Sequence, residues 1–265
     1  MKLKRKFVVF LLGALFFFSM HLKAQIVEMH HFNEINAYVD SETLIILDID
    51  DTLLIPVQML GCDEWFKYRL QKHRNEGMQH SIALEKTLAE WEAVRHLTRM
   101  EIVESGTDRI VNALQKRGFC VIGLTTQGVA LATRTRQQLK MQGFDFSANG
   151  VSEEDYYFLL EGEGMLFRRG ILFTCGKSKG KALFNLLEKS TFYPKRILFV
   201  NDKIEHLADV EEEAEKHSIE FLGLRYSYSD TRKAAFRPEI AEMQFEYSTF
   251  NHLLSDEEAY SFFFE

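Results

Sequence analysis

The feature that most constrains the fold is an apolar run at residues 43–47 that ends in closely spaced acids. Asp48, Asp50 and Asp51 follow this run within four residues. A continuous run of β-branched residues and leucines is typical of a strand buried on both faces, as at the centre of a parallel sheet. The three aspartates would then lie at the carboxyl edge of the sheet, where open α/β folds bind their ligands. We therefore expect an α/β fold with a polar site at this edge.

The three carboxylates differ in the direction that the strand gives them. Asp48 and Asp50 are two residues apart, so on an extended backbone their side chains point to the same side. Acids this close repel one another, and a shared cation would relieve the repulsion. Asp51 would point to the opposite side, and we expect its role to be structural. The alternative is a polar loop with solvated acids.

The N-terminal residues have the layout of a secretory signal. Four basic residues at positions 2–6 precede the uncharged run 7–22, and Ala24 follows as a small residue at a cleavage point. This layout predicts a signal peptide of residues 1–24, cleaved near Ala24. As a helix the run would span about 24 Å, short of the roughly 30 Å hydrocarbon core, which disfavours an uncleaved anchor. We expect an exported protein, periplasmic or secreted, with no stable membrane association after cleavage.

Charge and cysteine content argue against several classes of function. Residues 1–24 hold five basic residues and no acidic one, so their removal changes the formal net charge from −7 to −12. An acidic surface argues against nucleic-acid binding and against docking on anionic lipid. Cys62, Cys120 and Cys175 are widely spaced and form no C-x-x-C pattern. They predict neither a disulfide framework nor a zinc site, and one disulfide among them stays open.

The periodicity of the apolar residues predicts alternating strands and helices with one interruption. Steps of three and four residues across residues 59–104 indicate amphipathic helices. We interpret this segment as a helical cap inserted after the first strand, while residues 25–58 and 105–265 form one core. The alternation predicts that this core is a Rossmann-like parallel sheet with right-handed crossovers.

Several other segments are assigned by their local pattern. Residues 26–39 are expected to form a short amphipathic lead-in before the first strand, and residues 144–146 a short third strand. Residues 156–174 alternate apolar runs around two glycines, which predicts a β-hairpin excursion. Further buried strands are expected at residues 119–124, 196–200 and 219–224.

Polar side chains follow three of the expected strands. Asp48 and Asp50 follow the first strand, Thr125 the second and Asp202 the fourth, and a lysine-rich helix start lies between the last two. Carboxylates without histidine or cysteine at ligand spacing favour Mg²⁺, which keeps waters that a substrate phosphate can displace. The Thr125 hydroxyl, the backbone amides after it and a lysine would donate to phosphate oxygens. This constellation is typical of a phosphoryl-transfer site.

These residues also resemble, in their order, the four motifs of the haloacid dehalogenase superfamily. The resemblance spans about residues 42–224 and rests on Asp48-Ile49-Asp50-Asp51-Thr52, Thr125, Lys179 with Gly180, and Asn201-Asp202. It implies a HAD-like core with a C1-type cap between the first two motifs, in a secreted bacterial branch of unassigned substrate. It further implies that Asp48 is the nucleophile, which forms an aspartyl-phosphate, and that Asp50 is the general acid and base.

The resemblance also implies which residues bind the phosphate. Thr125 would hold a phosphate oxygen, with its neighbour Thr126 as a rival, and both Thr126 and Gln127 would contribute to substrate binding. Lys179 would neutralise the nucleophile and the phosphate. Lys177 and Lys181 could also reach forward, but Lys179 is favoured because a Lys-Gly pair followed by an apolar helix is the usual form of this motif.

The metal would be Mg²⁺, bound in this resemblance by Asp48, by the backbone carbonyl of Asp50 and by Asp202. Many relatives carry a second acid or an asparagine four residues after the last of these. This chain has His206 there, which leaves Asn201 or Glu205 to complete the outer metal shell.

The acid two residues after the nucleophile distinguishes between two reactions. A halide leaves without a proton, whereas an alkoxide needs one, so Asp50 favours phosphate ester hydrolysis. The predicted function is an exported Mg²⁺-dependent phosphohydrolase that acts on a small phosphorylated molecule under a helical cap. Two alternatives stay open: a catalytically weak or inactive secreted binding protein with the same fold, and a phosphotransferase that passes the phosphoryl group to an alcohol.

Overall fold

The computed structural model describes residues 25–148, 150–249 and 252–264. Its centre is an eight-stranded sheet in the order β1-β10-β9-β2-β5-β8-β7-β6. Neighbouring strands are parallel from β1 to β8 in this order, while β7 and β6 are each antiparallel to the strand before. The strands are β1 (Gln25–Met29), β2 (Thr43–Leu47), β5 (Cys120–Thr125), β6 (Tyr156–Leu160), β7 (Glu163–Arg168), β8 (Ile171–Phe173), β9 (Arg196–Asn201) and β10 (Glu220–Tyr226).

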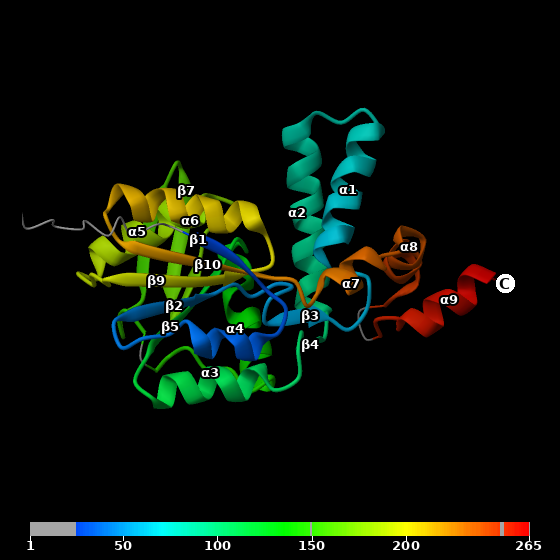
Figure 1. Cartoon of the computed structure of the whole chain (residues 1–265). Helices are drawn as coiled ribbons and strands as arrows, with labels where there is room; N and C mark the ends of the chain where they lie inside the picture. The colour runs from blue at the N-terminus through cyan, green and yellow to red at the C-terminus, as the bar shows by residue number, and fades with distance from the viewer. Residues whose placement is uncertain (1–24, 149, 250–251, 265) are drawn as a thin grey trace, which may run out of the picture.

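Helices cover both faces of this sheet (Figure 1). On one face lie α3 (Thr107–Lys116) and α4 (Ala132–Met141), and on the other α5 (Lys179–Lys189) and α6 (Ile204–Lys216). Alternate residues of β2 enter the two apolar clusters between the layers: Ile45 and Leu47 one, Leu44 and Ile46 the other. The strand is thus buried on both faces, and the predicted α/β fold with a mostly parallel, Rossmann-like sheet is confirmed.

The chain reverses its direction across the sheet at β2. From β2 it adds β5 and β8 on one side, and then β9 and β10 on the other. Leu47 pairs with both Gly123 and Val200, so the carboxyl ends of three neighbouring strands lie level. The Asp48 N–H continues the ladder by donating to the Val200 carbonyl at 3.0 Å. The residues that follow β2, β5 and β9 are therefore brought to one edge, at the switch point where open sheets bind ligands.

A pair of helices stands away from this edge (Figure 1). α1 (Asp63–Asn75) and α2 (His80–Leu97) lie inside the segment 59–104 that was interpreted as a cap. The chain leaves and re-enters the core through a two-stranded sheet, in which β3 (Leu54–Pro56) pairs with β4 (Met100–Ile102). Of the C-terminal helices, α8 (Pro238–Tyr247) contacts α1, and α9 (Asp256–Phe264) packs on α8. α7 (Asp230–Ala234) precedes α8 in the chain.

Two expectations about the strands are wrong. Residues 26–39 do not form an amphipathic lead-in, because Gln25–Met29 is an edge strand paired with β10 and Phe32–Ala37 is a 3-10 helix. The helix pair is consequently inserted after the second strand of the central sheet, β2, and after the short strand β3. Residues 144–146 lie in a loop, and the position beside β5 belongs to β8. Phe144 and Phe146 are buried there with their rings stacked, since an apolar pair two residues apart can be buried in a loop as well as in a strand.

Three further findings concern membrane-spanning helices, the predicted signal peptide and the cysteines. No helix within the described ranges is long and apolar enough to cross a membrane. The predicted signal peptide, residues 1–24, lies outside the described residues. Cys62, Cys120 and Cys175 are free thiols.

Candidate active site

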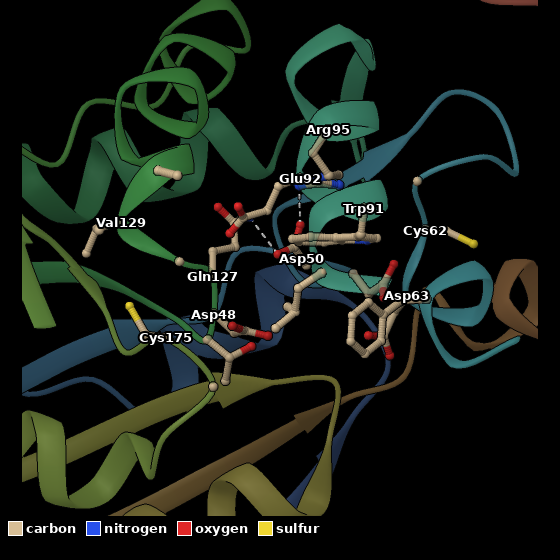
Figure 2. A pocket seen from close by; sticks show the side chains of 18 of the residues that line it. Asp48, Asp50, Cys62, Asp63, Trp91, Glu92, Arg95, Gln127, Val129 and Cys175 are labelled. Carbon is tan, nitrogen blue, oxygen red and sulfur yellow. Dashed lines mark hydrogen bonds and ion pairs between the residues drawn. The ribbon is translucent and has the colours of Figure 1, made fainter. Parts of the chain in front are cut away.

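A cavity of about 610 Å³ lies between the carboxyl edge of the sheet and the α1–α2 pair (Figure 2). Its volume is that of a pocket for a small molecule, about 300–1,000 Å³. Asp48 and Asp50 lie on the sheet side, and α2 supplies Trp91, Glu92 and Arg95. Lys179, Thr125 and Asp202 do not line the cavity and lie beneath its surface, each no more than 2% exposed.

Asp48 and Lys179 form a pair that is nearly withdrawn from water. Lys179 Nζ donates to Asp48 Oδ1 at 2.5 Å, and the two residues are 1% and 4% exposed. Burial raises the pKa of Asp48, the Lys179 ammonium opposes that rise, and the Asp202 carboxylate adds to it. A second positive charge beside Asp48 and Asp202 would favour the ionised carboxylates. Lys181, one of the rival lysines, instead pairs with Glu161.

Asp50 is held from two sides of the cavity. Its Oδ1 accepts a hydrogen bond from Arg95 Nη2 at 2.5 Å, and its Oδ2 accepts one from Gln127 Nε2 at 2.7 Å. The Thr135 hydroxyl donates to Gln127 Oε1 and so fixes the orientation of that amide. Arg95 is 3% exposed, and its guanidinium lies 5.1 Å from the centre of the Trp91 ring. The helix pair therefore contributes a charged contact to the residue predicted as acid and base.

One carboxylate oxygen of Asp202 could bind a cation. Its Oδ2 accepts a hydrogen bond from Lys233 Nζ at 2.9 Å. Its Oδ1 is buried and has no hydrogen-bond partner among the described residues. Leaving a buried acceptor without a donor costs free energy, about 1–3 kcal/mol, which a bound cation would offset.

The donor set at this position suits Mg²⁺. In the part of the chain that the structure describes, no group of three or more His, Cys, Asp or Glu is arranged to hold a metal ion. A cation here would rest on the carboxylates of Asp48 and Asp202, a backbone carbonyl and waters. Mg²⁺ is commonly bound in this way, through one or two carboxylates and several waters, while substrate phosphate supplies further oxygens.

The loop after β5 brings two of its three predicted residues to the cavity. Thr126 and Gln127 line it, whereas Thr125 lies below and its Oγ1 accepts a hydrogen bond from the Gln127 N–H at 3.2 Å. A hydroxyl keeps its own hydrogen to donate in such a contact. The Gln127 side chain is already engaged with Asp50, so its contact in this structure positions the acid.

Asp51 lines the cavity, contrary to the expectation that it points away. Its φ of 60° takes the chain out of the extended conformation, so the alternation of side chains along the strand ends there. The Asp51 N–H donates to the Leu54 carbonyl at 2.9 Å and closes a tight turn. Burial raises the pKa of Asp51 well above its usual range, and Asp202 adds to the rise. Burial thus disfavours the charged form of Asp51 in the cavity wall, and its structural role stays a prediction.

His206 also lines the cavity. Burial, together with the Lys179 and Lys203 ammonium groups, lowers the pKa of His206 to about 3, which favours a neutral ring. Its Nδ1 lies 3.4 Å from Asn201 Nδ2, while Asn201 Oδ1 accepts a hydrogen bond from the Lys203 N–H. The amide oxygen of Asn201 is therefore engaged within its own loop. Glu205 is exposed.

Three contacts of the site were not predicted from the sequence. Arg95 binds Asp50, Lys233 binds Asp202, and Lys203 Nζ lies 2.9 Å from an Asp63 oxygen at the start of α1. Arg95 follows Trp91 by four residues, and this helical spacing places both on one face, a signal that could have indicated it. Lys233 lies beyond the last strand, where no local pattern points back to the sheet edge.

Comparison with known proteins places the chain in a family without a known activity. The model of the family described as "Protein of unknown function (DUF2608)" matches residues 28–260, and the chain belongs to this family. This description does not name the haloacid dehalogenase superfamily.

Relatives are found in two groups of bacteria. A "Putative outer membrane protein" of Chlamydia pneumoniae is 24% identical over 253 residues, which cover 96% of this chain and 94% of the relative. A protein of the same description from Chlamydia trachomatis is 23% identical over 222 residues, 84% of this chain and 82% of the relative. An "Uncharacterized protein" of Rickettsia prowazekii is 25% identical over 220 residues, 78% and 77% of the two chains.

Among the similar solved structures is one of low sequence identity. It is described as "The crystal structure of a hydrolase from Pseudomonas syringae", with 16% identity and a TM-score of 0.41. The similarity covers 68% of this chain and 83% of that one. A likeness of this size supports no inference about activity.

Proposed function

We propose that this DUF2608 protein is an exported Mg²⁺-dependent phosphohydrolase that cleaves a small phosphate monoester. The observation that carries the proposal is the buried Asp48–Lys179 pair, at 2.5 Å, beside the Asp202 oxygen that lacks a donor among the described residues. The resemblance of the four motifs to the haloacid dehalogenase superfamily supports the same chemistry. In this proposal residues 59–104 act as a cap and the rest of the described chain as the core.

The reaction proceeds in two displacements at phosphorus. A carboxylate oxygen of Asp48 attacks the phosphorus and forms an aspartyl-phosphate, while the bond to the alcohol oxygen breaks. Asp50 gives its proton to the leaving alkoxide. Asp50 then accepts a proton from a water, which attacks the phosphorus, breaks the bond to Asp48 and releases phosphate.

The charge of the phosphate is balanced by groups beneath the cavity. Mg²⁺, held by Asp48, the Asp50 backbone carbonyl and Asp202, would supply positive charge to the phosphate oxygens. Lys179 neutralises Asp48 before attack and the transferred phosphoryl group after it. The Thr125 hydroxyl and the backbone N–H of Thr126 donate to the remaining phosphate oxygens.

The ion pair with Arg95 is the contact that Asp50 would give up in order to act as an acid. Both of its oxygens accept hydrogen bonds, from Arg95 and from Gln127, and a protonated Asp50 has no charge to pair with the Arg95 guanidinium. Arg95 carries a positive charge and lies at the cavity, so the incoming phosphate would attract it. Transfer of Arg95 from Asp50 to the substrate would leave Asp50 Oδ1 ready to hold the proton.

Export is supported by two observations. Residues 1–24 have the layout of a signal peptide, and the two Chlamydia relatives are described as outer membrane proteins. We propose that this chain is likewise exported, with cleavage near Ala24.

The test is an assay of protein purified after expression of the full chain. Turnover of para-nitrophenyl phosphate and of a phosphorylated metabolite panel is measured with Mg²⁺, with chelator, and for Asp48→Asn. We expect turnover that needs Mg²⁺ and falls by a factor of about 10³ or more in Asp48→Asn. Wild-type protein that is folded by circular dichroism but shows no metal-dependent turnover would overturn the proposal and favour the binding protein. Phosphorylated product formed with an added alcohol would identify a phosphotransferase instead.

A further inference from the structure

We infer that the substrate is the phosphate ester of an apolar alcohol, alkyl or aryl, and not a sugar phosphate or a nucleotide. This inference rests on the proposed function, because it concerns the part of the substrate that leaves. It is carried by the composition of the cavity wall that faces the phosphate position.

The wall formed by the helix pair is apolar. Phe66 of α1 and Leu84, Leu88 and Trp91 of α2 line it. The Phe66 and Trp91 rings pack edge to face, with 6.1 Å between their centres. None of the cavity-lining residues within α1 and α2 is serine, threonine, asparagine or glutamine.

The loop after β5 adds two apolar side chains, Val129 and Ala130, to a side that also carries Thr126, Gln127 and Lys177. In Figure 2, Val129 lies across the cavity from Trp91, with Asp48 and Asp50 between them. An ester whose phosphorus lies at Asp48 would therefore extend its alcohol between these two side chains.

The charged residues of the helix pair are mostly engaged already. Asp63 pairs with Lys203 at 2.9 Å and with Lys67 at 2.8 Å, and Arg95 pairs with Asp50. These groups are not free to bind substrate hydroxyls without losing an ion pair.

Glu92 is the exception among these charged residues. It forms no hydrogen bond or ion pair with a described residue, and its carboxylate lies against the loop after β5, where a Cβ at Gly128 would come within 2.6 Å of Oε1. An unpaired carboxylate here would repel a second anionic group on the substrate. A diphosphate or a carboxylate-bearing alcohol is therefore disfavoured.

The wall distinguishes substrates by the cost of desolvation. A sugar hydroxyl placed against Phe66 and Leu88 would lose its water without gaining a partner, at about 1–3 kcal/mol for each hydroxyl. An apolar group in the same place gains about 25 cal/mol for each Å² removed from water. Both effects favour an alkyl or aryl ester over a sugar phosphate.

The test compares two phosphates of matched shape, cyclohexylmethyl phosphate and glucose 6-phosphate. Both are phosphate esters of a primary alcohol that is attached to a six-membered ring, and only glucose 6-phosphate carries hydroxyls on that ring. We expect kcat/KM for cyclohexylmethyl phosphate to exceed that for glucose 6-phosphate by a factor of about ten or more. If the enzyme turns over para-nitrophenyl phosphate but neither of these two esters, each ester is tested as a competitive inhibitor of that reaction. Their inhibition constants are then compared in place of kcat/KM.

Two variants on α2 test whether the cavity wall causes the preference for the apolar ester. Leu88 lines the cavity and is 40% exposed, whereas Leu97 is 38% exposed and lies outside the lining. Leu88→Gln should reduce the preference for the apolar ester by a factor of about five, and Leu97→Gln should leave it unchanged. Equal or reversed preference in the wild type, or an equal effect of both variants, would overturn this inference while para-nitrophenyl phosphate turnover still supported the proposed function. Loss of all Mg²⁺-dependent turnover would instead overturn the proposed function, and this inference with it.

Discussion

Arg69 links α1 to α2 and α8 through ion pairs, and its replacement tests how much these contacts stabilise the helix pair. Its guanidinium donates to both oxygens of Glu90 on α2, at 2.9 and 2.8 Å, and to Glu242 on α8 at 2.9 Å. It also lies 4.8 Å from the centre of the Phe245 ring. The Arg69 side chain is 8% exposed, so these contacts are screened little by water. We expect Arg69→Met to loosen α1 from both helices.

The expected loss of stability depends on which ion-pair partners Glu90 and Glu242 keep when Arg69 is removed. Removing one partner of a buried ion pair costs about 3–5 kcal/mol when the other charge is left alone. Here Glu90 keeps His73 at 3.1 Å and Glu242 keeps Lys72 at 2.5 Å. The methionine side chain also retains part of the apolar packing. We therefore expect a loss of about 2–4 kcal/mol in the free energy of unfolding, or a fall in Tm of roughly 5–15 °C for a chain of this size.

The two tryptophans of the chain provide a local assay. Trp65 lies on α1 and Trp91 on α2, so tryptophan fluorescence reports on the helix pair while circular dichroism reports on the whole protein. Arg74→Met is the matched control, because Arg74 is an exposed residue of α1 with no ion pair to the described residues. A fluorescence midpoint for Arg69→Met equal to that of Arg74→Met would refute the reasoning.

Two further predictions concern Glu104 and Arg95. Glu104 accepts hydrogen bonds from the Tyr226 hydroxyl at 2.6 Å and the Phe32 N–H at 2.7 Å. Burial raises the pKa of Glu104, but these hydrogen bonds lower it by more, so the pKa in the folded protein lies below that in the unfolded chain. The ionised Glu104 therefore stabilises the fold above about pH 4.3, and this stabilisation is lost as the pH falls through the folded-state pKa. Glu104→Gln should therefore cost about 1–2 kcal/mol at pH 7 in urea unfolding and progressively less below pH 4, and a difference independent of pH would contradict this. Arg95→Met should lower kcat/KM for aryl phosphates by about 10–100-fold through misplacement of Asp50, with partial recovery in Arg95→Lys, and unchanged kinetics would contradict the role.

Local pattern was sufficient for the elements that lead into the site. The apolar run at residues 43–47 gave a strand buried on both faces, because a continuous apolar strand can be stable only between two layers. Lys179 was selected from three lysines by the glycine and the apolar helix that follow it, and it is the lysine that reaches Asp48. Both choices depend on residues close together in the chain.

Local pattern failed where the chain leaves regular structure. Asp51 was assigned to the opposite face by alternation, and its left-handed φ brings it to the cavity wall. Phe144 and Phe146 have the spacing of a strand, but they are buried in a loop. In each case the apolar or acidic pattern was identified, while the backbone conformation that decides its direction was set by neighbouring segments.

By itself the sequence determined which residues end the central strands, and therefore that Asp48, Asp50 and Asp202 meet at one edge of a parallel sheet. Only the tertiary structure decided what holds these acids: Arg95 from α2 on Asp50, and Lys233 from α7 on Asp202. It also placed β1 against β10, from the other end of the chain. Strand ends follow from periodicity along the chain, whereas the partner of a buried charge depends on which distant helix packs over it, and no local spacing specifies that.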